Sequence, residues 1–451
     1  MVALGHEVTL WTNEGAFVSS TEVERRPPPS GVKEGIVTEV RLERRVQAVA
    51  DEIFGNFVWA TSRQPLQVCH YMFHFPPMLA NLLEIKNLVV VSPGIYMPDA
   101  YADVLTVPTV SSYIPHMITR GSDRLPFVDR LKNAIFNALN NPALAQLPGG
   151  ISRKEEAEWR APPNEDRPPL FDVLGEMKAI FINGDRLLDF PRPLPYGVKY
   201  LGDFKKGKAT EEKASLKLGD EWETIVSDQS KAGVIVFSLG TVANTTMMPN
   251  HTRVALVGAF ELLSNYTIIW KFDTSIPEIE SKPDSFGHIH LSAWVPQRQL
   301  LAHPRTRLFI THAGYNSLLE AAKAGVPALY TPLFGDQFAD AYRALRFGCG
   351  AMIDIKSETV TSAAIVEWVN RLVDDPNYAA NAKRLARLLN DQMVAPEVEL
   401  AANLVQMVKM PAEFLTSREA QRMGQLASLG LDLFLGVVVT ASIVVRLLSG
   451  V

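Results

Sequence analysis

The second half of the chain alternates short apolar runs with stretches whose apolar residues recur at helical spacing. Runs such as GVIVFSLG (233–240) and TRLFITH (306–312) are almost continuously apolar, which is typical of strands buried on both faces of a parallel sheet. Between such runs, segments such as TSAAIVEWVNRLVDD (361–375) place apolar residues three and four positions apart, which predicts amphipathic helices. The alternation predicts a doubly wound α/β domain over residues 223–395.

The first half shows the same alternation in a less regular form. Apolar runs at 87–94, 107–113 and 179–184 predict buried strands, and the pattern of 127–140 predicts a helix between them. We therefore expect a second α/β domain over residues 1–204, with its first strand and helix largely missing.

Two further segments connect or follow these domains. Residues 205–222 are rich in charge and nearly free of large apolar side chains, which indicates a linker. Residues 396–428 are expected to form C-terminal helices.

Near the C-terminus, residues 429–448 are strongly apolar and predict a transmembrane helix. The stretch from Leu433 to Val445 carries no charge, and Asp432 and Arg446 flank it. This stretch is short for a bilayer, which needs about 20 mostly apolar residues, so side chains at its ends would have to reach the interface. The alternative is a buried amphipathic helix, which the all-round apolar character disfavours. The N-terminus has no basic start followed by an apolar run, so no signal peptide is recognised there.

Composition narrows the class of protein. A chain of 451 residues is long for a single core, which favours two domains. The formal net charge of -5 argues against a nucleic-acid-binding protein, and two cysteines exclude a disulfide framework.

The most informative junction is LFITHAGYNSLLEA, where an apolar run meets a helix-forming segment. Ligands of open α/β sheets bind beyond the carboxyl ends of strands, and the first turn of a helix attracts phosphate through its unpaired N–H groups. His312, Gly314, Asn316 and Ser317 lie at this turn, and Glu320 follows one turn later on the same face as Asn316. Diphosphate at the helix start and ribose on Glu320 would suit a nucleotide. The alternative is an ordinary helix capped by Asn or Ser.

Neighbouring segments add two pairs of candidate residues. Trp294 could stack on a flat base, and Gln297 could hydrogen-bond to its edge. Asp336 and Gln337 are adjacent groups suited to the hydroxyls of a sugar, although such a pair is more often part of a turn.

These residues belong to an ordered series of motifs. W-x-P-Q begins at 294, L-L-x-H-P at 300, F-I-T-H-x-G-x-N-S-x-x-E at 309, and P-L-F-G-D-Q at 332. The series resembles the signature of the animal UDP-glycosyltransferases, which include the UDP-glucuronosyltransferases, and the resemblance covers nearly the whole chain. It implies a GT-B fold, with two Rossmann-like doubly wound domains facing each other across a cleft.

By position, the resemblance implies which residues contact a UDP-sugar. Trp294 would stack on uracil, Gln297 would contact the uridine, and Glu320 would bind the ribose. The remaining assignments are His312, Gly314, Asn316 and Ser317 on the diphosphate, with Thr241 helping, and Asp336 and Gln337 on the transferred sugar. One departure is Ala313, where the family usually has a second glycine, because alanine is strained if φ is positive.

The implied reaction is inverting transfer of a hexose, glucose or glucuronic acid, from a UDP-sugar to a small lipophilic acceptor. No cofactor or metal is needed if helix N–H groups and His312 stabilise the leaving diphosphate. In the family a histidine base, oriented by an aspartate, activates the acceptor. The histidine's position lies before Met1 and the aspartate's position holds Ser92, so we assign no catalytic residue. Two hypotheses stay open: an enzyme whose first segment is missing here, and a catalytically impaired UDP-sugar-binding homologue or partner subunit.

The resemblance also implies a location. A single-pass protein of the endoplasmic reticulum membrane with lumenal domains is expected, associating with itself or with relatives. The sequons that begin at Asn244, Asn250 and Asn265 fit a lumenal domain.

Overall fold

The computed structural model describes residues 217–391 without a break. Elsewhere it describes residues 8–10, 32–34, 66–70, 75–82, 87–92, 94–95, 104, 107, 110–115, 120–139, 153–161, 166–202, 399, 402–403, 406–407, 409–410 and 431–449. The linker expected at 205–222 and the helices expected at 396–428 therefore lie largely outside the described residues. Within the former range, Asp220 already begins helix α10 (Asp220–Val226).

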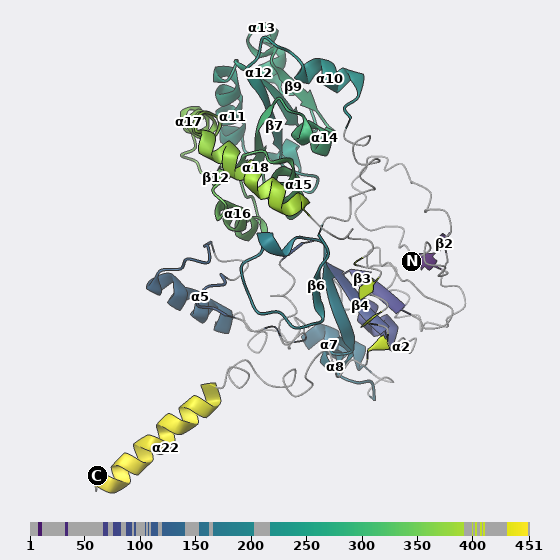
Figure 1. Cartoon of the computed structure of the whole chain (residues 1–451), viewed down its shortest axis with the longest axis vertical. Coiled ribbons are helices and arrows are strands. Elements are labelled where there is room, and N and C mark those ends of the chain that lie inside the picture. Colours follow the sequence, from purple (N-terminus) through teal and green to yellow (C-terminus); the bar gives the residue numbers. More distant parts are fainter. Residues whose placement is uncertain are drawn as a thin grey trace.

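A six-stranded parallel sheet forms the centre of the C-terminal domain (Figure 1). Its strand order is β12–β11–β10–β7–β8–β9. Its strands are β7 (Gly233–Ser238), β8 (Tyr266–Lys271), β9 (Ile289–Ser292), β10 (Thr306–Thr311), β11 (Ala328–Tyr330) and β12 (Gly350–Met352). All six residues of β7 are buried, as the continuous apolar run predicts. On one face, Trp270 packs edge to face against Phe260 with ring centroids 5.1 Å apart.

Helices cover this sheet and complete the doubly wound pattern. They are α11 (Asn250–Leu262), α12 (Pro277–Glu280), α13 (Pro283–Phe286), α14 (Gln297–Ala302), α15 (Tyr315–Ala324), α16 (Gln337–Leu345), α17 (Ser362–Asp374) and α18 (Pro376–Asn390). From β7 the chain proceeds through β8 to β9 on one side. It then returns to β10 on the other side of β7, so the winding direction reverses between β7 and β10. The carboxyl ends of these two strands are the place where open α/β sheets bind ligands.

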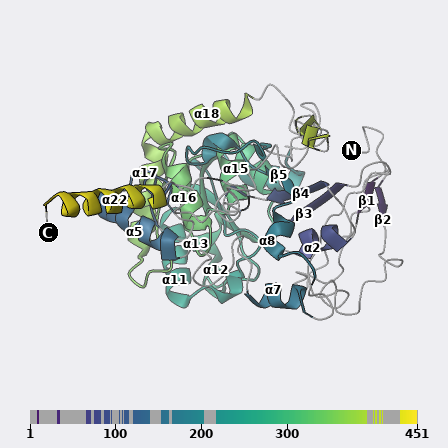
Figure 2. The same cartoon turned by 90° about the horizontal axis from the view of Figure 1, so that it is seen from below.

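The N-terminal domain contains a four-stranded parallel sheet in the order β3–β4–β5–β6. The strands are β3 (Leu66–His70), β4 (Asn87–Ser92), β5 (Met177–Ile182) and β6 (Val198–Tyr200), and the helices are α2 (Phe75–Leu82), α5 (Phe127–Leu139), α7 (Arg153–Trp159) and α8 (Leu170–Leu174). Each of these strands lies beside its predecessor, so the described part of this domain is wound in one direction only. A separate two-stranded pair, β1 (Val8–Leu10) with β2 (Val32–Glu34), lies apart from this sheet (Figure 2).

The strands expected at 87–94 and 179–184 and the helix expected at 127–140 are confirmed, but the strand expected at 107–113 is wrong. Residues 110–114 form a turn in which the N–H groups of Tyr113 and Ile114 donate to the carbonyl of Val110. The side-chain amide of Asn133 on α5 donates to the carbonyls of Ser111 and Ile114, each at 2.8 Å. Because a side chain satisfies these carbonyls, the segment needs no neighbouring strand.

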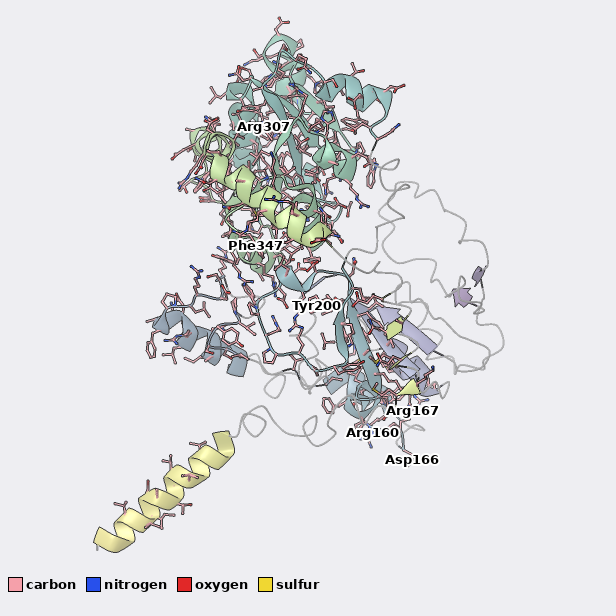
Figure 3. The ribbon with its side chains drawn as sticks, viewed as in Figure 1. Arg160, Asp166, Arg167, Tyr200, Arg307 and Phe347 are labelled. Atoms are coloured by element: carbon pink, nitrogen blue, oxygen red, sulfur yellow. The ribbon has the colours of Figure 1, made fainter. Side chains whose placement is uncertain are left out.

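The two domains share one apolar core. It joins residues of the N-terminal sheet, such as Leu88 and Ile180, to residues of α15 and α18, such as Leu318 and Leu385. Figure 3 labels Tyr200 on the N-terminal side of this boundary and Phe347 on the C-terminal side.

Polar contacts also cross the boundary. Asp189 of the N-terminal domain accepts from Arg343 Nε at 3.0 Å, and the backbone carbonyl of Asp189 accepts from Arg346 at 2.8 Å. The backbone N–H of Asp185, just after β5, donates to the hydroxyl of Tyr315 at 2.9 Å. The domains are therefore held by charged and polar groups as well as by apolar packing.

The apolar C-terminal segment forms α22 (Leu431–Ser449), on the side of the molecule opposite to β1 and β2 (Figures 1 and 2). Among the described residues, no helix is both long and apolar enough to cross a membrane. The transmembrane assignment of residues 429–448 stays a prediction. Asp432 and Arg446 both lie within α22.

Candidate functional site

A cavity of about 720 Å³ opens at the carboxyl ends of β7, β8 and β10. We call it the donor pocket. Eight of the ten predicted site residues line it: Thr241, Trp294, Gln297, His312, Gly314, Asn316, Ser317 and Glu320. Residues as far apart in the chain as Thr241 and Glu320, 79 positions, thus meet where the strand order reverses. This is the place where a ligand site was predicted from the sequence.

The start of α15 is open to a ligand. Its N-cap is Gly314, which has no side chain to bond the first-turn N–H groups, and no side-chain capping bond is present. Asn316 and Ser317 are the second and third helical residues rather than caps. The interpretation of this junction as an ordinary capped helix is therefore wrong, and the positive end of the helix dipole faces the pocket.

His312 is held between two glycines at this junction. A Cβ at Gly240 would lie 2.6 Å from the imidazole Cε1, and a Cβ at Gly314 would overlap Nε2. Gly240 also has a φ of +80°, which favours glycine. Burial lowers the pKa of His312 to about 4, with a smaller contribution from Lys271, and a hydrogen bond to the backbone of Ser238 opposes it. The imidazole is therefore neutral near pH 7.

Ala313 has a φ of +66° and is completely buried. The left-handed backbone that a second glycine would adopt easily is thus present, and it is occupied by alanine. The strain predicted for this residue is confirmed.

Gln297, Ser317 and Glu320 form a hydrogen-bonded group along one wall. Gln297 Nε2 donates to Glu320 Oε2 at 2.8 Å and to Ser317 Oγ at 3.2 Å. This arrangement orients the Glu320 carboxylate at the pocket wall, where it can accept from hydroxyl groups of a ligand.

Trp294 lies at the mouth of the pocket. Its side chain is 71% exposed, although tryptophan is usually well buried. Ser292 Oγ fixes the backbone on both sides, donating to the carbonyl of Trp294 at 2.7 Å and accepting from its N–H at 3.3 Å. A fixed and exposed indole can stack on a flat ring.

The predicted sugar-binding pair is placed differently. Asp336 and Gln337 stand at the start of α16 and do not line the donor pocket. Gln337 is buried, and its Oε1 accepts from the N–H groups of Leu333 at 2.8 Å and Phe334 at 3.1 Å. Burial raises the pKa of Asp336, and a backbone hydrogen bond and, to a smaller extent, the charge of Arg343 oppose this only partly. The sugar-binding role of both residues stays a prediction.

Lys271 and Arg298 also line the donor pocket, and the sequence reading missed both. Lys271 ends β8 and is 9% exposed, and its Nζ donates to the carbonyl of Gly240 at 2.7 Å. Lys271 could have been predicted from the sequence, because it lies at the carboxyl end of a buried strand. The carboxyl ends of the neighbouring strands carry the other pocket residues.

Ser92 is the last residue of β4 and is completely buried. Its Oγ donates to the carbonyl of Gly94 at 2.6 Å and accepts from the Gly94 N–H at 3.3 Å. The hydroxyl thus closes a local turn, and it lacks the charge that an aspartate would place there. Within the described residues, no group of three or more His, Cys, Asp or Glu could hold a metal ion, and the expectation that the reaction needs no metal stays a prediction.

Comparison with known proteins gives a consistent family. The family model described as "UDP-glucoronosyl and UDP-glucosyl transferase" matches residues 59–413. Among relatives, ugt-60 of Caenorhabditis elegans is 32% identical over 382 residues, which is 84% of this chain and 72% of the relative. UDP-glucuronosyltransferase 1A4 of Oryctolagus cuniculus is 28% identical, over 75% of this chain and 64% of its own length. Against UDP-glucuronosyltransferase 1A3 of Homo sapiens, the match is 28% identical and covers 67% of this chain but only 52% of the relative.

Solved structures agree on the fold. The glycosyltransferase of kitacinnamycin superposes with a TM-score of 0.51 at 19% identity, over 77% of each chain. Os79 from O. sativa superposes with a TM-score of 0.52 at 16% identity, over 75% of this chain and 76% of its own. These neighbours support the GT-B glycosyltransferase fold. The family match extends over both domains, and the chain belongs to the UDP-glucuronosyl and UDP-glucosyl transferase family.

Proposed function

We propose that this chain transfers a hexose, glucose or glucuronic acid, from a UDP-sugar to a hydroxyl group of a small lipophilic acceptor, with inversion at the anomeric carbon. The observation that carries the proposal is the donor pocket. It brings an exposed indole, an oriented carboxylate and an uncapped helix start into one cavity. These are the partners required by a base, a ribose and a diphosphate, in that order.

Each part of the donor has a partner in this arrangement. Uracil stacks on Trp294, and the ribose hydroxyls donate to Glu320, whose orientation is set by Gln297. The diphosphate accepts from the first-turn N–H groups of α15. Asp336 and Gln337 are then available to the hexose from the start of α16, which we retain as a prediction.

The reaction breaks the bond between the anomeric carbon and the diphosphate oxygen. The acceptor oxygen attacks the anomeric carbon from the opposite face, UDP leaves with the bonding electrons, and the acceptor proton passes to a base. The α15 N–H groups stabilise the charge that develops on the departing UDP. His312 is neutral near pH 7, so it contributes a hydrogen bond rather than a positive charge.

A second candidate function is UDP-sugar binding without efficient transfer. Ser92 favours it, because this position holds a buried neutral hydroxyl engaged with Gly94. Such a side chain cannot stabilise a protonated histidine as a carboxylate does.

The donor proposal is tested by calorimetry with UDP. Trp294→Ala is expected to weaken UDP binding about 10-fold or more, because it removes the stacking surface. The matched control is Leu262→Ala, which truncates a similarly exposed apolar side chain at the far end of α11, at the amino ends of the strands. Absence of UDP binding by the unaltered chain would exclude both candidate functions.

The two candidates are separated by turnover. Product formation from UDP-glucose or UDP-glucuronic acid, with a panel of lipophilic alcohols and phenols, supports the transferase, and EDTA is expected to leave it unchanged. UDP binding without product supports the binding protein. An increase in transfer on Ser92→Asp would show that the neutral side chain limits the reaction.

We also propose that both domains reside in the lumen of the endoplasmic reticulum. In support, the asparagines of all three sequons in the C-terminal domain are exposed: Asn244, Asn250 and Asn265. An endoglycosidase should then increase the mobility of the protein isolated from its natural source, and unchanged mobility would argue against this location.

A further inference from the structure

Lys271 is a charged residue of the donor pocket whose role no motif assigns. We propose that the Lys271 ammonium supplies the positive charge that opposes the diphosphate of the donor, while its bond to Gly240 keeps the loop after β7 in place. This inference rests on the proposed function, because it assumes that the pocket binds a nucleoside diphosphate.

The position of Lys271 follows from the strand order. β8 lies beside β7, and β7 lies beside β10, so their three carboxyl ends are adjacent. Lys271 ends β8, Ser238 ends β7, and His312 directly follows β10. A charge on Lys271 therefore faces the loops that precede the start of α15.

A chain of contacts links Lys271 to that helix start. Its Nζ donates to the carbonyl of Gly240, Gly240 packs against the His312 ring, and the other side of the ring packs against Gly314, the N-cap of α15. An ammonium group has three N–H donors. With one donor on Gly240, the others can reach phosphate oxygens without loss of the loop contact.

The charge balance of the pocket requires such a group. A UDP-sugar brings two negative charges on its diphosphate, and the departing UDP gains more. The basic and carboxylic side chains that line the pocket are Lys271, Arg298, His312 and Glu320. His312 is uncharged near pH 7, and a carboxyl group such as that of Glu320 cannot supply positive charge. Arg298 follows Gln297 on α14, on the wall where the base is expected. This leaves Lys271 as the cation beside the phosphate-binding loops.

Burial increases the effect of this charge. Lys271 is 9% exposed, so water screens its ammonium less than it screens an exposed lysine. A buried cation that gains an anionic partner on binding contributes more to affinity than a surface one.

The test separates charge from loop support by using ligands with and without phosphate. Lys271→Gln removes the charge but keeps an N–H donor for the Gly240 carbonyl, and Lys271→Arg keeps the charge. Affinities for UDP and uridine are measured by competition against a fluorescent UDP analogue at 20 and 200 mM salt. We expect Lys271→Gln to weaken UDP binding about 10- to 100-fold and uridine binding less than about 3-fold. The salt dependence of UDP binding should also become smaller. We expect Lys271→Arg to stay within about 5-fold of the unaltered protein.

The control is Lys231→Gln. Lys231 also donates to a backbone carbonyl, that of Ser264 at 2.8 Å, but it precedes β7 at the opposite edge of the sheet. Equal loss of UDP and uridine affinity in Lys271→Gln would overturn the proposal in favour of a purely structural role. Unchanged UDP affinity would also overturn it. If Lys271→Gln does not fold, Lys271→Arg decides. Equal loss of UDP and uridine affinity in Lys271→Arg would indicate a purely structural lysine. Failure of the unaltered protein to bind UDP would refute the proposed function instead.

Discussion

Single residues at the β10–α15 junction carry both the strain and the electrostatics of the site. Ala313 adopts a left-handed backbone that costs an alanine about 1 kcal/mol relative to glycine, but its buried methyl group returns about 0.8 kcal/mol. Because the two terms nearly cancel, alanine is tolerated where the family usually has glycine.

Substitution of Ala313 tests this balance. Ala313→Gly should change the free energy of unfolding by less than about 1 kcal/mol, whereas Ala313→Val should lower it by about 2 kcal/mol or more, because a β-branched side chain fits neither the backbone nor the space. Urea unfolding of both variants provides the measurement. A valine variant as stable as the glycine variant would contradict the assigned backbone conformation.

His312 should make stability depend on pH. Its folded-state pKa of about 4 lies below the ordinary value of 6.5, so between these values the unfolded chain binds the proton more readily. The stabilisation is complete above about pH 6.5 and is lost as the pH falls toward 4. At full burial the shift corresponds to about 3 kcal/mol, and the ring's partial exposure to the pocket reduces this to roughly 1–2 kcal/mol. Comparing the free energy of unfolding of the unaltered protein with that of His312→Asn from pH 4 to 7.5 isolates the contribution of His312. Parallel curves for the two proteins would contradict it.

At the scale of elements, strands buried on both faces could be predicted well, because a continuous apolar run has few other places to fold. β7, β8 and β10 are examples. The turn within the segment at 107–113 could not be predicted, because the side chain of Asn133 on a later helix satisfies its carbonyls. The clustering of the eight pocket residues follows from strand ends that adjoin in space. Lys271 was missed because a lysine after an apolar run looks like a boundary, and only the strand order brings it beside His312.

Helix α17 offers a test of local capping. Its N-cap Thr361 accepts from the N–H of Ala364 at 3.2 Å, and its buried residues Ile365, Val369 and Leu372 pack into the core beside the sheet. Thr361→Ala should lower the free energy of unfolding by about 1 kcal/mol. Thr361→Ser should retain most of this capping contribution, because serine keeps the hydroxyl group. Thermal unfolding distinguishes the two, and equal losses would show that the hydroxyl does not cap the helix.

For the whole molecule, the boundary between the domains contains a buried ionic cluster. Burial alone would raise the pKa of Asp189, but the guanidinium groups of Arg343 and Arg192 outweigh it, so the pKa is lowered and the carboxylate stays ionised. Tyr200 also donates to this carboxylate at 2.5 Å. Asp340, paired with the same Arg343 at 3.1 Å, has its pKa raised by burial. The Asp189 carboxylate is thus the principal anionic partner of these arginines.

Removing one member of this cluster should cost more than removing two. Asp189→Leu leaves the guanidinium of Arg343 buried without that partner, so the free energy of unfolding should fall by about 3 kcal/mol. Adding Arg343→Met should restore about 1 kcal/mol or more, because one of the two buried guanidinium groups that faced Asp189 is then gone and only that of Arg192 remains. The complete set of single and double variants in urea measures this coupling. Strictly additive losses would contradict it.

The hydrogen bond from Asp185 to Tyr315 has a consequence for communication between the domains. Tyr315 is the first residue of α15, so the turn that faces the pocket also contacts the N-terminal domain. If a nucleotide at this turn changes the free energy of domain docking, docking must change nucleotide affinity by the same amount. Tyr315→Phe removes this bond without removing the ring, and would therefore reveal how much of that reciprocal coupling passes through a single hydroxyl group.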